Sequence, residues 1–141
     1  MSVKRILVIA SHHRMAEGLK QTLEFVSGGG QETVALSAYV DNCPVEKSIA
    51  ELMDRFEQED EVLVLTDLTA GSVNQHFFQY RNRPHTHIIS GMNLPLAFQI
   101  AMEPQGEYIR EERIREIIEE AKNEMRYVNE IADDGDDDDD E

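Results

Sequence analysis

The chain has 141 residues, with 13 Lys and Arg against 29 Asp and Glu, and a net charge of −16 at neutral pH. This length fits one domain with a real hydrophobic core, and the excess of acid argues against binding to nucleic acid or an anionic membrane and favours a basic protein partner. No apolar run is long enough to span a membrane or to form a secretory signal, so we expect a cytoplasmic protein.

Five successive apolar residues, 6–10, make the first element of the chain. Such a short apolar run is typical of a strand that is buried on both faces of a parallel sheet. Ser11 and His12 follow it directly. Because ligands of open α/β sheets bind beyond the carboxyl ends of the strands, His12 is a candidate site residue on position alone.

A helix, a strand and a second helix are expected next. Apolar residues recur at helical spacing over residues 15–26, and the three glycines at 28–30 end that helix. Residues 33–40 are rich in β-preferring types and predict a strand. After a turn at 41–44, an amphipathic pattern predicts a helix over residues 45–56.

Residues 61–66 repeat the character of the first strand, and Asp67 stands at their end. A short loop, 68–72, leads to a third helix that reaches Tyr80. Ser72 is placed to cap the first turn of this helix. The end of this strand therefore also carries polar side chains that suit a site.

The last third of the chain predicts a fourth strand at residues 87–90, a helix at 94–102 and a final amphipathic helix at 111–124. Residues 127–131 alternate less helically, and we expect a short antiparallel strand at the edge of the sheet. The last ten residues, 132–141, are almost entirely acidic. They predict a disordered tail, because like charges repel and nothing there can be buried.

Strand and helix alternate along the chain, which predicts one α/β domain over residues 1–131. We expect a doubly wound, mostly parallel sheet flanked by helices on both faces. Right-handed crossovers leave few topologies, and we expect the strand order 2-1-3-4. In that order the winding reverses between the first and third strands, so the loop with Ser11 and His12 faces the loop over residues 67–72.

A histidine beside an aspartate, near hydroxyls and backbone amides, suits the transient covalent attachment of an anion. One ring nitrogen of His12 would be the free nucleophile, while the Asp67 carboxylate would hold the opposite N–H and support the cation that forms. Hydroxyls and amides could receive phosphoryl oxygens, so the chemistry requires no metal and no cofactor. A metal site is not supported, since the adjacent His12 and His13 project in divergent directions and lack HxH or HxxxH spacing.

Three motifs together resemble one known family. They are SHHRMAEG at residues 11–18, TDLTAGSVN at 66–74 and ISGMNLP at 89–95. In this order and spacing they are similar to the enzyme IIA domain of the mannose family of the bacterial phosphoenolpyruvate sugar phosphotransferase system. The resemblance implies a doubly wound α/β fold and, usually, a homodimer in which a C-terminal antiparallel strand contributes across the interface.

The resemblance also implies a role for the motif residues. His12 would be phosphorylated on Nε2 by the histidine-containing phosphocarrier protein and would pass the group to a IIB component, with the membrane components IIC and IID reached indirectly. Asp67 would orient His12 through Nδ1–H. The residues implied to hold the phosphoryl group are Ser72 and the backbone amide of Gly71, with Ser11 and Thr69 at the rim.

The chain departs from the family pattern at two positions. His13 stands where the family commonly has Gly, and Ala70 stands where it often has Gly. Gly91 and Asn93 match the third motif and would shape the loop beside the site without taking part in the chemistry.

Two other functions remain open. One is the related phosphocarrier domain that feeds a dihydroxyacetone kinase, in which the chemistry is the same and only the acceptor differs. The other is a noncatalytic, receiver-like regulatory module with Asp67 as the acceptor. Receivers gather several acids around a magnesium ion, whereas the first strand here ends in Ser11 and His12.

Overall fold

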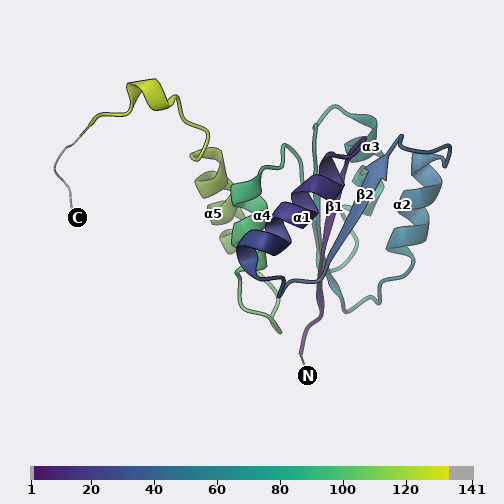
Figure 1. The fold of residues 1–141 in the computed structure, drawn as a ribbon. Helices are drawn as coiled ribbons and strands as arrows, with labels where there is room; N and C mark the ends of the chain where they lie inside the picture. Colours follow the sequence, from purple (N-terminus) through teal and green to yellow (C-terminus); the bar gives the residue numbers. More distant parts are fainter. Residues whose placement is uncertain (1, 134–141) are drawn as a thin grey trace.

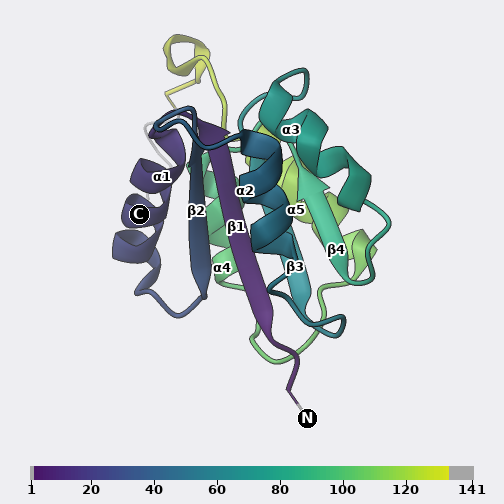
Figure 2. The same ribbon diagram turned by 90° about the vertical axis from the view of Figure 1, so that its right-hand side faces the viewer.

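The computed structural model describes residues 2–133, so the predicted acidic tail at 132–141 lies almost entirely outside the described residues. The chain forms a four-stranded parallel sheet between two layers of helices (Figure 1). The strands are β1 (Arg5–His12), β2 (Thr33–Ala38), β3 (Glu61–Thr66) and β4 (Thr86–Ile89). Their order is β2-β1-β3-β4, from left to right in Figure 2. The predicted α/β class and the strand order 2-1-3-4 are confirmed.

Five α-helices within the described residues cover the two faces of the sheet. One face carries α1 (Met15–Ser27), α4 (Leu94–Ala101) and α5 (Glu111–Lys122). The other face carries α2 (Val45–Met53) and α3 (Ser72–Phe77), which continues into the 3-10 helix η1 (Phe78–Tyr80). No helix in residues 2–133 is long and apolar enough to cross a bilayer.

The central strands are buried because helices cover both of their faces. Alternate side chains of β1 enter opposite cores, so that Leu7 and Ile9 pack on the side of α1, α4 and α5. Ile6 and Val8 pack on the side of α2 and α3. Residues 6–10 have no exposed surface, and this is why the strand is a continuous apolar run rather than an alternating one.

Apart from the strand predicted at residues 127–131, the predicted helices and strands begin and end within three residues of expectation, and the ends of β1 and β2 matter most for the site. β1 continues past the apolar run because Ser11 and His12 still pair with β2. β2 ends at Ala38 rather than at residue 40, because Tyr39 adopts a left-handed backbone conformation with φ 65°. These two strand ends lie at the edge of the sheet where the candidate site is built.

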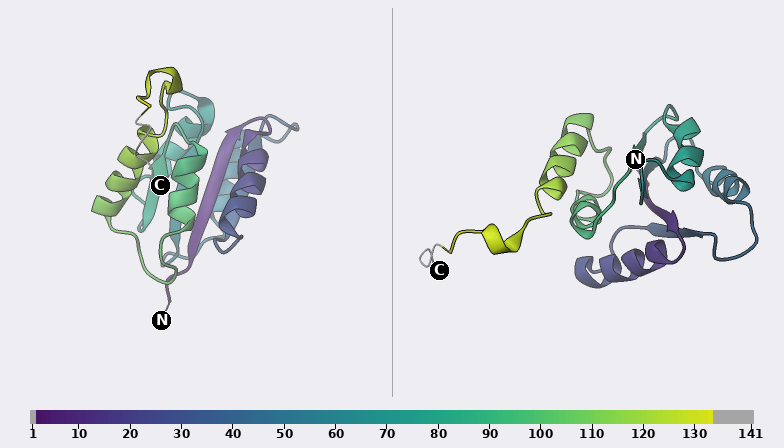
Figure 3. Two further views of the ribbon diagram at one scale, coloured as in Figure 1. Left: turned by 60° about the vertical axis from the view of Figure 1, so that its left-hand side comes forward. Right: turned by 90° about the horizontal axis from the view of Figure 1, so that it is seen from above.

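The prediction of an antiparallel edge strand at residues 127–131 is wrong. The segment instead contains the 3-10 helix η2 (Val128–Glu130), and Tyr127 and Val128 are exposed. It extends away from the body after α5 (Figures 1 and 3). Because no strand of the described residues lies beside it, its backbone groups bond locally, as from the Glu130 N–H to the Tyr127 carbonyl.

Candidate functional site

The parallel pairing of β1 with β3 brings the carboxyl ends of the two strands together. Ala10 pairs with Thr66 in this ladder, so His12 and Asp67 emerge at the same edge of the sheet. Nδ1 of His12 lies 2.9 Å from Oδ2 of Asp67. The two loops that were expected to face one another therefore meet in one site.

Three hydrogen bonds fix the Asp67 carboxylate. Oδ2 accepts from the backbone N–H of His12 at 2.7 Å as well as from the His12 ring, and Oδ1 accepts from the Leu68 N–H at 2.9 Å. The side chain is only 10% exposed, and burial by itself would raise its pKa. The hydrogen bonds from His12 and Leu68 outweigh that burial and lower the pKa of Asp67 below its ordinary value. The carboxylate is therefore charged and held in place at neutral pH.

The Asp67 carboxylate also determines which nitrogen of His12 is free. A charged carboxylate can only accept, so Nδ1 carries the proton and Nε2 carries the lone pair. The His12 side chain is 36% exposed, which leaves the ring open to solvent. Oγ of Ser72, the first residue of α3, lies 3.5 Å from Nε2. The site thus offers a nucleophilic nitrogen with a hydroxyl group beside it.

The loop after β3 is shaped around the His12 ring. A Cβ atom at Gly71 would lie 2.8 Å from Cε1 of His12, closer than side chains pack. The N–H of Gly71 already donates to the Leu68 carbonyl at 3.1 Å, so Gly71 contributes space for the ring rather than a free amide. Thr69 Oγ1 lies 2.5 Å from Ser90 Oγ, which ties this loop to the one after β4.

Ser11 does not lie at the rim that the resemblance implied for it. It is fully buried, and its Oγ accepts from the Ala16 N–H at 2.7 Å and donates to the His13 carbonyl at 3.1 Å. Successive side chains of a strand point to opposite faces, so Ser11 turns toward α1 while His12 turns toward Asp67. Ser11 therefore holds the start of α1.

His13 occupies a tight turn immediately after the candidate nucleophile. Its φ is 57°, and its N–H donates to the Ala38 carbonyl at 2.7 Å. Glycine adopts this left-handed conformation without steric cost, whereas residues with a side chain adopt it rarely. The side chain of His13 is exposed. Among residues 2–133, no three His, Cys, Asp or Glu side chains gather as metal ligands.

Tyr39 belongs to the site, although sequence analysis did not single it out. Its ring stacks on the His12 ring with 5.6 Å between centroids, and its hydroxyl lies 2.6 Å from Ser72 Oγ. A signal was available in the sequence. Tyr39 is the next-to-last residue of the strand predicted at residues 33–40, and parallel strands end at the same edge of the sheet.

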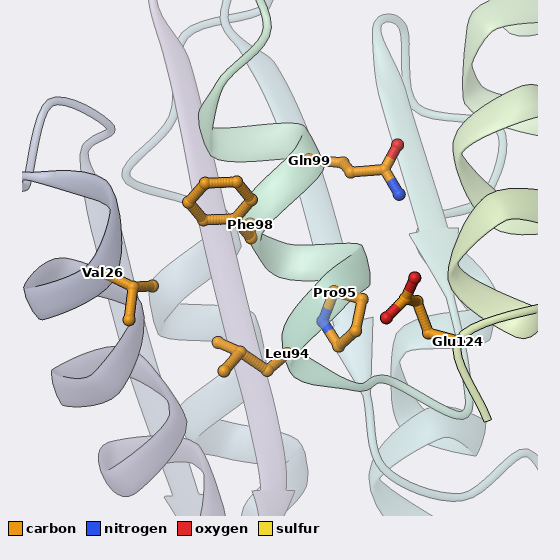
Figure 4. Close-up of a pocket in the computed structure, with 6 residues that line it drawn as sticks. All are labelled: Val26, Leu94, Pro95, Phe98, Gln99 and Glu124. Carbon is orange, nitrogen blue, oxygen red and sulfur yellow. The ribbon is translucent and has the colours of Figure 1, made fainter. Parts of the chain in front are cut away.

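An apolar groove lies between α1 and α4, apart from the His12 site (Figure 4). Its lining comes from the end of α1, from α4 and from the segment after α5, and consists of Val26, Leu94, Pro95, Phe98, Gln99 and Glu124. Glu124 is the one ionisable side chain in this lining. The groove therefore offers packing surface rather than a nucleophile or a pair of proton-transfer groups.

Comparisons with known proteins assign this fold to a family. The family model described as the PTS system fructose IIA component, EIIA-man, matches residues 6–119. A putative phosphoenolpyruvate-dependent sugar phosphotransferase system permease from Klebsiella pneumoniae has a similar solved structure, with 35% sequence identity and a TM-score of 0.83. The match covers 92% of this chain and 95% of that one.

Two further structures share the fold. The PTS IIA protein associated with the fucose utilization operon of Streptococcus pneumoniae is 26% identical over 91% of this chain and 96% of its own, with a TM-score of 0.76. The mannose/sorbose-specific IIA subunit from Enterococcus faecalis is 19% identical over 94% of this chain and 98% of its own, with a TM-score of 0.73. This chain therefore belongs to the mannose-type IIA (EIIA-man) family of phosphotransferase-system components, whose members carry a phosphohistidine intermediate in sugar transport.

Proposed function

We propose that this protein relays a phosphoryl group in sugar uptake, accepting it on Nε2 of His12 from the histidine-containing phosphocarrier protein and passing it to a IIB component. The observation that carries this proposal is the bond from Nδ1 of His12 to the Asp67 carboxylate, which leaves Nε2 as the nucleophile. Family membership supplies the class of reaction.

The transfer exchanges one P–N bond for another. Nε2 attacks phosphorus, the P–N bond of the donor phosphohistidine breaks, and its electron pair returns to the donor ring. The His12 ring becomes positively charged, and the Asp67 carboxylate on Nδ1–H stabilises that charge. The Ser72 hydroxyl lies where it can donate to a phosphoryl oxygen on Nε2. Transfer to the IIB component reverses these steps.

A phosphosite experiment tests this function directly. The protein is incubated with phosphoenolpyruvate and the general phosphotransfer enzymes, and the modified residue is mapped at neutral or alkaline pH. We expect an acid-labile phosphoryl group on His12, since phosphoramidate bonds break in acid. A stable adduct on another residue, or no adduct, would reject the relay.

The surface around the site is consistent with protein partners. Tyr39 and Leu68 are each more than half exposed; Tyr39 stacks on His12, and Leu68 directly follows Asp67. Exposed apolar and aromatic side chains are common where proteins dock. In this function the donor and the IIB acceptor meet the protein in the cytoplasm, and membrane components IIC and IID receive the group only indirectly.

A homodimer is part of the same proposal. Met125, Tyr127 and Val128 are mostly exposed, and they belong to the segment after α5 that extends away from the body of the chain (Figure 3). A second copy of the chain would bury them. The receiver-like alternative gains no support, because both oxygens of Asp67 already accept hydrogen bonds from His12 and Leu68.

The Asp67→Asn variant should transfer the phosphoryl group about 10- to 100-fold more slowly while remaining folded. An amide oxygen can still accept from the backbone N–H of His12, but a neutral group stabilises the charged ring poorly. Single-turnover transfer from the phosphorylated carrier measures the rate, and circular dichroism checks the fold. An unchanged rate would remove Asp67 from the mechanism.

The same variant has a distinct pH signature. Because the folded-state pKa of Asp67 is lowered, its carboxylate stabilises the fold fully above the unfolded-state pKa, about 4. That stabilisation is lost as the pH falls through the lower folded-state value. Urea unfolding below pH about 4 should therefore show a steeper loss of stability for the wild type than for Asp67→Asn. Equal slopes would contradict the lowered pKa.

A further inference from the structure

Tyr39 has an unusual backbone for a large side chain. It follows β2 with φ 65°, in the left-handed region that bulky residues adopt rarely. The neighbouring turn is left-handed as well, since His13 has φ 57° and its N–H donates to the Ala38 carbonyl. Backbone conformations of this kind persist where the surrounding structure holds them, and they gather at functional sites.

This conformation places Tyr39 across the site. The ring stacks on His12 with 24° between the ring planes, and the hydroxyl lies 2.6 Å from Ser72 Oγ. Ser72 Oγ in turn lies 3.5 Å from Nε2 of His12. One side chain thus connects the end of β1 with the start of α3, beside the nitrogen proposed to be phosphorylated.

We propose that Tyr39 is a positioning residue of the phosphoryl-transfer site. Its hydroxyl donates to Ser72 Oγ and directs the Ser72 proton at the phosphoryl group, while its ring shields that group from water. The proposal rests on the proposed function, in which His12 carries the phosphoryl group.

The role of the Tyr39 hydroxyl follows from the number of O–H donors that Tyr39 and Ser72 have. Ser72 and Tyr39 each have a single O–H donor. When Tyr39 donates to Ser72 Oγ, the Ser72 proton stays free for the oxygens of a phosphoryl group on Nε2. Hydrogen bonds in such a chain strengthen one another, so loss of the Tyr39 hydroxyl weakens the bond from Ser72.

The shielding role of the Tyr39 ring follows from the position of its hydroxyl group. Because that end is beside Ser72, the outer edge of the ring flanks the place of a phosphorus atom on Nε2. Hydrolysis requires water to attack this phosphorus, which breaks the P–N bond, returns its electron pair to the ring and releases inorganic phosphate. A ring that excludes water slows this side reaction.

The test separates the hydroxyl from the ring with two variants. Tyr39→Phe keeps the ring and removes the hydroxyl, whereas Tyr39→Leu removes both. Tyr108→Phe is a matched control at the opposite edge of the sheet. Tyr108 also stacks on a histidine, His85, at 3.8 Å between centroids, and its hydroxyl donates to the Glu59 carbonyl at 2.8 Å.

Two quantities are measured for each variant. The first is the single-turnover rate of transfer from the phosphorylated carrier at saturating carrier concentration, which separates transfer from docking. The second is the lifetime of the phosphohistidine in the isolated protein, followed by phosphorus NMR. For the lifetime, His12 is loaded with phosphoramidate, a small donor whose P–N bond breaks with release of ammonia and which needs no protein partner.

We expect Tyr39→Phe to slow transfer about three- to ten-fold, the worth of one hydrogen bond, with a nearly unchanged lifetime. Tyr39→Leu should slow transfer as much and also shorten the lifetime several-fold. In a Ser72→Ala background, Tyr39→Phe should have no further effect, because the two hydroxyls act through one bond. Tyr108→Phe should match the wild type in both measurements.

Wild-type transfer rates and lifetimes in both Tyr39 variants would overturn the proposal. Additive effects of Tyr39→Phe and Ser72→Ala would overturn the hydroxyl part, and a normal lifetime in Tyr39→Leu would overturn the ring part. If phosphoramidate loads His12 but the protein carrier does not, the proposed function fails, and the lifetimes still decide the role of Tyr39.

Discussion

Replacing His12 with alanine should leave a folded protein that accepts no phosphoryl group from the carrier. Transfer should fall about a thousand-fold or more, because the nucleophile itself is lost. His12 lies at the edge of the sheet with an open ring, so the free energy of unfolding should change by only about 1 kcal/mol. Intact-protein mass measured at alkaline pH counts the phosphoryl groups, and urea unfolding measures the stability.

The adjacent imidazole provides a matched control. His13 has an exposed side chain, and its backbone turns away in the left-handed conformation directly after His12. His13→Ala should therefore be phosphorylated as the wild type is. If His12→Ala kept its phosphoryl group and the double variant lost it, the group would belong to His13, and the orientation by Asp67 would have no part in the reaction.

Much of the fold could be predicted from the sequence because the signals are local. Residues 6–10 and 61–66 are short apolar runs, which strands buried on both faces require, and helical spacing separates them. Alternation of strand and helix then restricts the topology through right-handed crossovers. The meeting of His12 with Asp67 followed from topology alone, since His12 ends one strand and Asp67 directly follows its parallel neighbour.

The parts that were missed depend on contacts between distant segments. Alternation at residues 127–131 indicates a strand only where a neighbouring strand exists, and the described chain supplies none. Position 71 needs a glycine because the His12 ring lies so close that a Cβ atom would collide with it, and this closeness cannot be seen in the sequence. Tyr39 reaches Ser72 through a backbone turn that no local preference for tyrosine would predict. The inward direction of Ser11, in contrast, could have been derived from the alternation of side chains along its strand.

The buried ion pair between Arg5 and Glu61 should have the largest effect on stability. Arg5 Nε donates to Glu61 Oε1 at 2.8 Å, and both side chains are 1% exposed. The pair also fastens the loop over residues 103–109: Arg5 donates to three of its carbonyls, and Glu61 Oε2 accepts the Ile109 N–H at 2.7 Å. Glu61→Gln leaves a buried guanidinium without its counter-charge, which should cost about 3–5 kcal/mol. A loss of this size is a large fraction of the roughly 5–15 kcal/mol that stabilises a domain.

An exposed pair on α5 provides the comparison for this prediction. Arg115 and Glu111 are 3.2 Å apart and mostly exposed, so Arg115→Ala should cost less than about 1 kcal/mol in the same urea titrations. If Glu61→Gln cost no more than Arg115→Ala, water would have to reach the pair in solution. Arg5 and Glu61 begin their strands, whereas His12 ends one. Folded Glu61→Gln protein should therefore still be phosphorylated at the wild-type rate. This result would separate the stability of the sheet from the chemistry at its opposite edge.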